Sequence, residues 1–134
     1  MRFLSIYKSA ETGLPPTMEE MTTMGKLIEE WTKAGFLLGT EGCLPSAKGA
    51  RVRRTGDKLT VTDGPFAETK EVVGGFALLQ AKSKEEAIEM VKGFLKVAGD
   101  GECEIRQLYE PSAPGPEFKP ERTEAELRTQ WEAP

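Results

Sequence analysis

The chain has 134 residues, the size of a single domain that can bury one sizeable core, with 38% hydrophobic and 30% charged residues. Its net charge of −4 comes with no basic field of the kind that binds nucleic acid, and no apolar run approaches the roughly 20 residues that cross a bilayer. The apolar part of its start is too short for a signal peptide. These features predict a cytoplasmic protein that binds neither nucleic acid nor membranes.

Two elements are predicted in the first third of the chain. Residues 2–8 alternate in the manner of a strand that carries apolar side chains on both faces. Thr17, followed three residues later by Glu20, is a capping box that starts a helix, and Gly35 stands where such a helix ends. The apolar residues at helical spacing are Met21, Met24, Ile28 and Trp31.

The middle of the chain predicts strands. Residues 36–39 indicate a short buried strand, and residues 50–54 and 58–63 indicate a hairpin that turns at Gly56. Residues 72–81 form a nearly continuous apolar run, as expected of a strand that is buried on both faces.

A helix and a strand complete the predicted domain. Ser83 and Glu86 make a second capping box, which opens a helix that Gly99 closes, and residues 103–109 supply the last strand. The order β-α-β-(ββ)-β-α-β predicts an α+β, ferredoxin-like fold, with two helices on one face of an antiparallel sheet. We expect residues 1–110 to form this domain.

Residues 111–134 differ from the rest of the chain in composition. Several prolines and a glycine indicate a Pro-rich C-terminal extension, in which Thr123 and Glu126 predict the cap of a short helix. That helix would present Leu127 and Trp131 on one side. At under about ten residues it is marginal unless it docks on the domain or on a partner.

The face of the sheet that has no helices is expected to be covered. If it were wet, its strands would alternate cleanly between apolar and polar residues, and residues 2–8 and 72–81 do not. Leaving about six such side chains wet costs up to about 10 kcal/mol. We therefore expect a homodimer packed sheet to sheet, with a C-terminal extension that folds back over the sheet as the alternative.

Two compositional features limit the chemistry. The chain has no histidine, which removes the usual general base near neutral pH and the commonest metal ligand. Its cysteines, Cys43 and Cys103, have no metal-binding or redox spacing, and we expect both to be free thiols. The sequence therefore predicts neither a metal site nor a bound cofactor, and it leaves open whether the protein is an enzyme.

The most unusual segment is residues 63–71, a polar stretch with a Gly-Pro turn between two strands. Asp63 is the candidate acid or base, because it ends a strand on the same side as Leu59 and Val61. The rim of an apolar pocket at that place would suit it to proton transfer. The alternative is an Asx turn, in which the carboxylate bonds the backbone just ahead of Pro65.

Further candidates for ligand binding each have a structural alternative. Arg51 and Arg53 share a strand face and suit a carboxylate or phosphate clamp, or else they keep an edge hairpin charged against aggregation. Arg106 either holds an anion or pairs with an acid such as Asp63 or Glu71. The remaining candidates are Tyr7, Glu41, Glu68, Lys70 and Glu71. For the charged loop residues among them, the alternative is a solvated loop with an exposed ion pair.

The central run reads Val61-Thr62-Asp63-Gly64-Pro65-Phe66-Ala67-Glu68-Thr69-Lys70-Glu71 and continues to Gly74-Gly75-Phe76. In this run the chain resembles the signature of YCII-related proteins of the DGPF type. Supporting likenesses are Gly39-Thr40-Glu41-Gly42 after the first helix, the arginine strand before the signature, and Glu104-Ile105-Arg106 near the end. The resemblance covers roughly residues 1–110 and leaves the extension outside.

The resemblance implies a dimeric α+β barrel, in agreement with the predicted order of elements. It also implies a pocket between helices and sheet, with Asp63 in it. Some members of the broader family have a His–Asp pair proposed as an active site, of which only the Asp half could exist here. Some DGPF-type proteins are similar to domains encoded beside bacterial sigma factors, which implies a regulatory or signalling role.

Two functions stay open on the sequence. One is a non-catalytic protein that binds a small ligand or acts as an interaction or regulatory module. The alternative is a cofactor-free small-molecule enzyme, such as an isomerase, lyase or oxygenase, with Asp63 as acid or base. In that case Arg51, Arg53 or Arg106 would hold an anionic group of the substrate.

Overall fold

The computed structural model describes residues 1–110 of the chain. Its elements are β1 (Arg2–Ser9), α1 (Met18–Lys33), β2 (Leu37–Gly42), the 3₁₀ turn η1 (Ser46–Lys48), β3 (Ala50–Thr55), β4 (Lys58–Asp63), β5 (Val72–Gln80), α2 (Lys84–Ala98) and β6 (Glu102–Gln107). The predicted order of helices and strands is confirmed. The Pro-rich extension and its predicted short helix lie outside the described residues.

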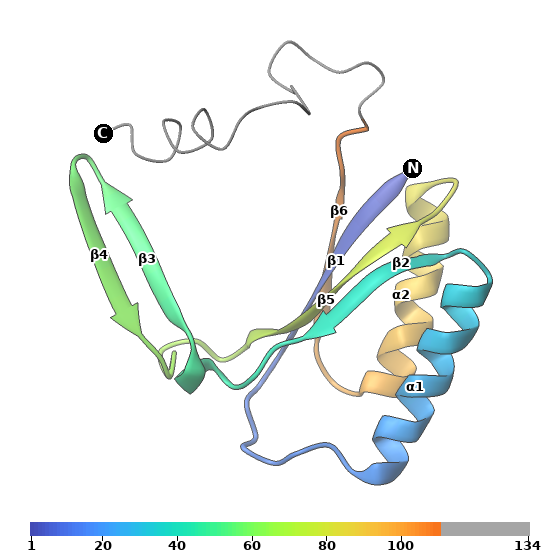
Figure 1. The fold of residues 1–134 in the computed structure, drawn as a ribbon, viewed down its shortest axis with the longest axis horizontal. Helices are drawn as coiled ribbons and strands as arrows, with labels where there is room; N and C mark the ends of the chain where they lie inside the picture. Colours follow the sequence, from blue (N-terminus) through green and yellow to red (C-terminus); the bar gives the residue numbers. More distant parts are fainter. Residues whose placement is uncertain (111–134) are drawn as a thin grey trace, which may run out of the picture.

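Four strands form one antiparallel sheet in the order β2-β5-β1-β6. Both helices lie on the same side of this sheet, next to each other (Figure 1). This is the ferredoxin-like arrangement that the sequence predicts. The core lies between the helices and the sheet, where Phe3 and Leu79 from the central strands meet Ala87 and Val91 of α2.

The ends of both helices follow the capping signals in the sequence. Backbone amides in the first turns donate 3.1 Å hydrogen bonds to Thr17 Oγ1 in α1 and to Ser83 Oγ in α2. Gly35 and Gly99 follow the helices with φ angles of 82° and 92°, which residues with a Cβ rarely adopt. These local signals fix where each helix starts and ends.

Strand β2 differs from the prediction of a short buried strand. It extends to Gly42, and among its residues only Leu37 is buried, whereas Leu38 is 51% exposed. The reason is its place at the edge of the sheet, beside β5 alone. Residues at an edge lose the cover that a second neighbouring strand would provide.

The side of the sheet that faces away from the helices carries apolar residues in its middle. In the register of β1 and β5, Leu4 lies opposite Leu78 and Ile6 lies opposite Phe76. All four side chains are partly exposed in the single chain. We call this surface the open face, and its apolar centre agrees with the predicted lack of clean alternation.

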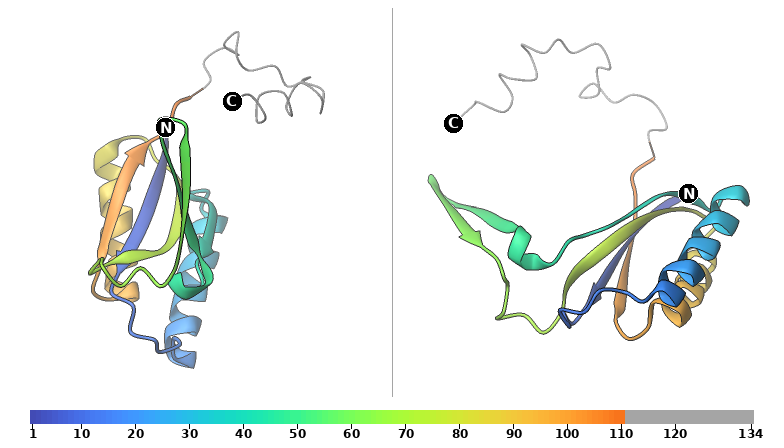
Figure 2. Two further views of the ribbon diagram at one scale, coloured as in Figure 1. Left: turned by 90° about the vertical axis from the view of Figure 1, so that its left-hand side faces the viewer. Right: turned by 60° about the horizontal axis from the view of Figure 1, so that its bottom comes forward.

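Strands β3 and β4 form a separate two-stranded sheet, which projects away from the body (Figure 2). The predicted hairpin is confirmed, and Gly56 in its turn has a φ of 61°. Every residue of both strands is exposed. We call this hairpin, residues 50–63, the arm.

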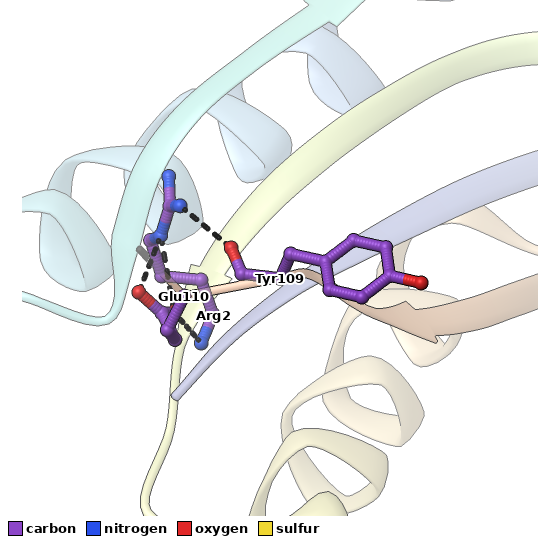
Figure 3. Close-up of polar contacts among 3 residues, drawn as sticks. All are labelled: Arg2, Tyr109 and Glu110. Atoms are coloured by element: carbon purple, nitrogen blue, oxygen red, sulfur yellow. Dashed lines mark hydrogen bonds and ion pairs between the residues drawn. The ribbon is translucent and has the colours of Figure 1, made fainter. Parts of the chain in front are cut away.

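The two ends of the described chain are joined. Arg2 Nε lies 3.1 Å from a carboxylate oxygen of Glu110, the backbone amide of Arg2 donates to the same oxygen at 3.0 Å, and Arg2 Nη2 donates to the carbonyl oxygen of Tyr109 at 3.3 Å (Figure 3). Leu108 also donates from its backbone to Arg2. Within residues 1–110, neither helix has the length and apolar character needed to span a bilayer.

Candidate functional site

The segment Asp63-Gly64-Pro65-Phe66, which we call the DGPF segment, connects the arm to the body, and with η1 it forms the root of the arm. Its centre is the side chain of Ser46 in η1, which is 8% exposed. Ser46 Oγ donates to a Glu11 carboxylate oxygen at 2.8 Å and accepts a hydrogen bond from the backbone amide of Phe66 at 3.1 Å. Gly64 donates from its backbone to Gly49 at 3.0 Å, which closes the loop against η1.

Gly64 is required at this root by close contact. A Cβ at this position would collide with the backbone carbonyl of Ser46, so no residue with a side chain fits without movement of the backbone. The following Gly64–Pro65 peptide bond is cis. The Gly-Pro pair of the signature therefore serves to seat the loop on η1.

Arg51 is held by the same loop. Its Cζ lies 3.9 Å from the centroid of the Phe66 ring, and its Nη1 forms an ion pair with Glu68. A backbone hydrogen bond, and then the Arg51 guanidinium, hold the pKa of the exposed Glu68 carboxyl below its usual value. Glu68 thus pairs with Arg51 of β3 and not with Lys70 of its own loop, and the loop engages the Arg51 guanidinium through both its face and its edge.

The structure places Asp63 at the end of β4, exposed to solvent. As expected from strand alternation, it shares a face of the arm with Leu59 and Val61. The expected pocket rim is not found there: Asp63 lines neither a cavity of about 570 Å³ between the helices and the sheet nor a hollow of about 300 Å³ beside Phe66. The reason is that the arm stands apart from the body, so no second layer of the described chain covers this face. A role for Asp63 as acid or base stays a prediction.

A cavity of about 570 Å³ lies between the helices and the sheet. Its wall on α1 consists of the residues that the sequence places on the inner side of that helix: Met21, Met24, Ile28 and Trp31. Phe94 and Val97 of α2 and Leu37 and Leu79 of the sheet contribute further apolar surface. Helix α1 has no fully buried residue, because its apolar stripe borders this space and only Ile28 and Trp31 also reach the core.

Few polar groups line the cavity. Ser5 is buried beneath it, and Thr40 and Tyr7 lie along its sheet side. The Tyr7 hydroxyl donates to the carbonyl oxygen of Asp100 at 3.0 Å, and its ring packs edge-on against Phe94 with centroids 5.4 Å apart. Tyr7 is therefore held in place by two contacts at one end of the cavity.

Of the nine candidate residues, two line this cavity. These are Tyr7 and Glu41, the latter near the exposed end of β2. Lys70 instead borders a smaller hollow of about 300 Å³ beneath the DGPF loop, together with Glu11 and Phe66. Arg53 and Glu71 are exposed on the arm and ahead of β5, respectively. The candidates are thus divided between the body and the arm and do not form one site.

Arg106 lies on β6, on the open face, and its partner differs from the predicted one. An acid pairs with Arg106, as expected, but it is Glu104, 3.4 Å from Nη1 and two residues earlier on the same strand, and not Asp63 or Glu71. Lys8 approaches Glu104 from β1 at 3.1 Å. Lys8, and then Arg106, lower the pKa of the Glu104 carboxyl.

Sequence reasoning missed two features of these sites. The resemblance implied a pocket between helices and sheet, but it did not point to the α1 residues that line it, because no sequence signal separates an apolar stripe that borders a cavity from one that fills a core. Ser46 and Glu11 were not singled out either, since they lie 35 residues apart and only the fold brings them together. Within residues 1–110 no group of three or more Cys, Asp or Glu residues is placed to hold a metal ion.

Comparison with known families gives a match over the whole described chain. A family model described as YCII-related domain matches residues 1–111. The uncharacterized protein R00369 of Rhizobium meliloti (strain 1021) is 31% identical over 94 residues, which cover 68% of this chain and 76% of that protein.

A solved structure shares the fold at low sequence identity. It is 5-chloro-2-hydroxyhydroquinone dehydrochlorinase (TftG) from Burkholderia phenoliruptrix AC1100, in complex with 2,5-dihydroxybenzoquinone. The superposition has a TM-score of 0.52 and 17% identity, and it covers 81% of this chain and 94% of the other. At this identity the likeness supports the α+β fold and nothing finer.

Proposed function

The chain belongs to the YCII-related domain family, and from that premise we propose that it binds a small, largely apolar molecule in the cavity between α1, α2 and the sheet. The observation that carries this proposal is the inner stripe of α1. Its methionine, isoleucine and tryptophan side chains border a space of about 570 Å³, and only Ile28 and Trp31 among them also pack against the core.

The size and lining of the cavity support a ligand of this class. Small-molecule sites in proteins are typically hollows of about 300–1,000 Å³ with mostly apolar walls and a few fixed polar groups. Apolar walls gain about 25 cal/mol for each Å² that a ligand removes from water. Tyr7, held by Asp100 and Phe94, is the best-fixed polar group for orienting such a ligand.

Charge at the cavity limits the ligand further. Among the described residues that line it, none is Lys or Arg, and the acidic ones are Glu20 and Glu41, of which Glu41 pairs with Phe76 and so directs its carboxylate to the open face. The arginines that would clamp an anionic group lie elsewhere: Arg51 at the loop, Arg53 on the arm and Arg106 on the open face. A neutral ring compound therefore suits the cavity better than a carboxylate or phosphate.

The alternative proposal is an enzyme in which Asp63 is the acid or base. Asp63 is remote from the cavity lining and exposed, and the neighbouring Arg51 is engaged by Phe66 and Glu68. That arrangement favours ligand binding over catalysis at Asp63.

The same proposal includes a homodimer of the domain formed by residues 1–110, joined through the open faces. In the single chain, Leu4, Ile6, Phe76 and Leu78 form an apolar centre that is only partly covered. A second copy with the same surface would bury it symmetrically. Leu38, which is 51% exposed, extends this surface at the β2 edge.

A cavity-filling substitution tests the ligand proposal. Gly25 lines the cavity, four residues after Met21, and a Cβ at this position would meet no atom within 4 Å. We expect Gly25→Leu to fold with unchanged or higher stability, because glycine costs a helix about 1 kcal/mol relative to alanine. The leucine side chain would occupy the space that the ligand needs.

The measurement is thermal shift and calorimetry with neutral ring compounds such as indole and 1-naphthol, against matched anions such as benzoate. Gly25→Ala is the control, because it makes the same change to the helix with a smaller side chain. We expect binding of the neutral probes to persist in Gly25→Ala and to be lost in Gly25→Leu. Binding that survives Gly25→Leu unchanged would place the ligand elsewhere and refute the proposal.

A further inference from the structure

The arm has two chemically different faces. Strand pairing places Val52 opposite Val61, and Leu59 lies on the same face of the hairpin, with Arg54 near the turn and Asp63 at the root as its charged members. The side chains of Val52, Val61 and Leu59 are 69%, 66% and 68% exposed. The other face carries Arg51, Arg53, Lys58 and threonines. The arm is thus an amphipathic hairpin, and its apolar face is not covered by any described part of its own chain.

An uncovered hairpin of this kind is not expected to be stable by itself. Two strands without a third strand or a packed layer are marginal in water. The root of the arm is nevertheless built firmly, through the bonds of Ser46 to Glu11 and Phe66 and the tight approach of Gly64 to η1. The root of the arm is thus fixed, while the apolar side chains of its strands are covered by no described part of the chain. This combination indicates that the arm is oriented for contact with another molecule.

Charge identifies that molecule. The arm, residues 50–63, contains four Lys or Arg residues and two Asp residues, a net charge of +2. The remaining described residues, 1–49 and 64–110, contain eleven Lys or Arg and fifteen Asp or Glu, a net charge of −4. The arm and the body of the same protein are therefore of opposite charge, and opposite charges favour association of the arm with a second body.

We propose that the arm is an intermolecular clasp, whose apolar face of Val52, Leu59 and Val61 packs on the body of a second copy of this chain. The inference rests on the proposed homodimer for its partner and adds a contact that the open faces do not provide. In a two-fold dimer each copy extends one arm and receives one, so the contact occurs twice.

A nucleic acid is the less suitable occupant. It would contact the basic face of the arm and leave the three apolar side chains in water. A second copy suits both faces of the arm. The partly exposed apolar side chains of its body match the apolar face, and its net negative charge matches the basic face. The two candidate partners, a second copy of the chain and a nucleic acid, can therefore be distinguished by which face of the arm the contact covers.

Two substitutions on adjacent residues of β4 test the clasp. Val61→Glu places a carboxylate on the apolar face, and Thr62→Glu places the same charge on the opposite face of the same strand. We expect Val61→Glu to weaken dimerisation about 100-fold, because it would bury an unpaired charge in the contact. Thr62→Glu should change the dimer dissociation constant by less than about 5-fold, since it alters only screened surface charge.

The measurement is sedimentation equilibrium of the full chain over a concentration series, with hydrogen exchange of the arm amides in the dimer and after dilution to monomer. Protection of β3 and β4 amides should appear in the dimer alone. Equal effects of the two variants, or arm amides that exchange freely in the wild-type dimer, would overturn the clasp. A wild-type chain that is monomeric at every concentration would overturn both the clasp and the proposed homodimer.

Cavity binding is tested separately, so failure of the clasp does not affect it. Indole and 1-naphthol should bind Val61→Glu as they bind the wild-type chain, because Val61 does not line the cavity. If the wild-type chain binds duplex DNA and Thr62→Glu reduces that binding more than Val61→Glu does, the basic face is the docking surface and the clasp is refuted.

Discussion

The helix–sheet body and the arm with its DGPF root differ in what they contain: the cavity lies in the body, and the distinctive sequence motif lies at the root of the arm. The body has the cavity, whose walls consist of residues with the pattern of an ordinary core. The arm and its root have the most distinctive run of the sequence, and that run is used to seat a loop on η1. A conspicuous motif can thus serve the structure, while the space for a ligand arises from residues of ordinary pattern.

The sharpest test of this division is Gly64→Ala. A Cβ at Gly64 would collide with the Ser46 carbonyl, and we expect a loss of about 2–3 kcal/mol in the free energy of unfolding. Gly49→Ala is the matched control, since a Cβ there would meet its nearest atom at 3.5 Å, an ordinary contact. Chemical denaturation measures both. Equal stability of the two variants would show that the root tolerates a side chain.

A smaller loss is expected from Ser46→Ala. This change leaves the partly buried backbone amide of Phe66 without its acceptor and removes one partner of the Glu11 carboxylate. We expect a cost of about 1–2 kcal/mol, with faster exchange of amides in the loop and the arm. Binding of neutral ring compounds to the body should be unchanged. Loss of that binding would mean that root and cavity act as one unit.

The smallest effects concern two exposed carboxylates, one in each region. The lowered pKa of Glu104 arises first from Lys8, whereas that of Glu68 arises first from a backbone hydrogen bond. Lys8→Met should therefore raise the pKa of Glu104 more than Arg51→Met raises that of Glu68. Carboxyl titration by NMR measures both shifts, and an equal response would contradict the assigned causes.

The sign of the pH dependence follows from these pKa values. A carboxyl whose pKa is lower in the folded chain than in the unfolded chain stabilises the fold above its ordinary pKa. That contribution disappears as the pH falls through the lowered folded value. Both carboxyls are exposed, so we expect only a shallow decrease in stability on the acid side.

Local signals predicted the fold well. Thr17 and Ser83 start the helices where the capping boxes indicate, and the hairpin turns at Gly56 as expected. These features depend on neighbouring residues, so the sequence contains them directly. The burial of β2 was overestimated, because strand order decides which strands are edges and strand order depends on distant pairings.

The candidate site was predicted less well, for a physical reason. Alternation correctly placed Asp63 beside Val61 on one face, yet it cannot tell whether another layer covers that face. Similarly, Arg106 was expected to find an acid far away in sequence, whereas Glu104 stands two residues from it. Tyr7 and Glu41, proposed without a specific motif, are the two candidates that line the cavity.

The bonds between Arg2 and Glu110 have a practical consequence for spectroscopy. Because they bring the first and last described residues together, a donor fluorophore at position 1 and an acceptor at position 110 would lie within efficient energy-transfer range in the folded domain. An unfolded chain of this length extends to tens of ångströms. Such a labelled pair would report unfolding of the body without disturbing either the cavity or the arm.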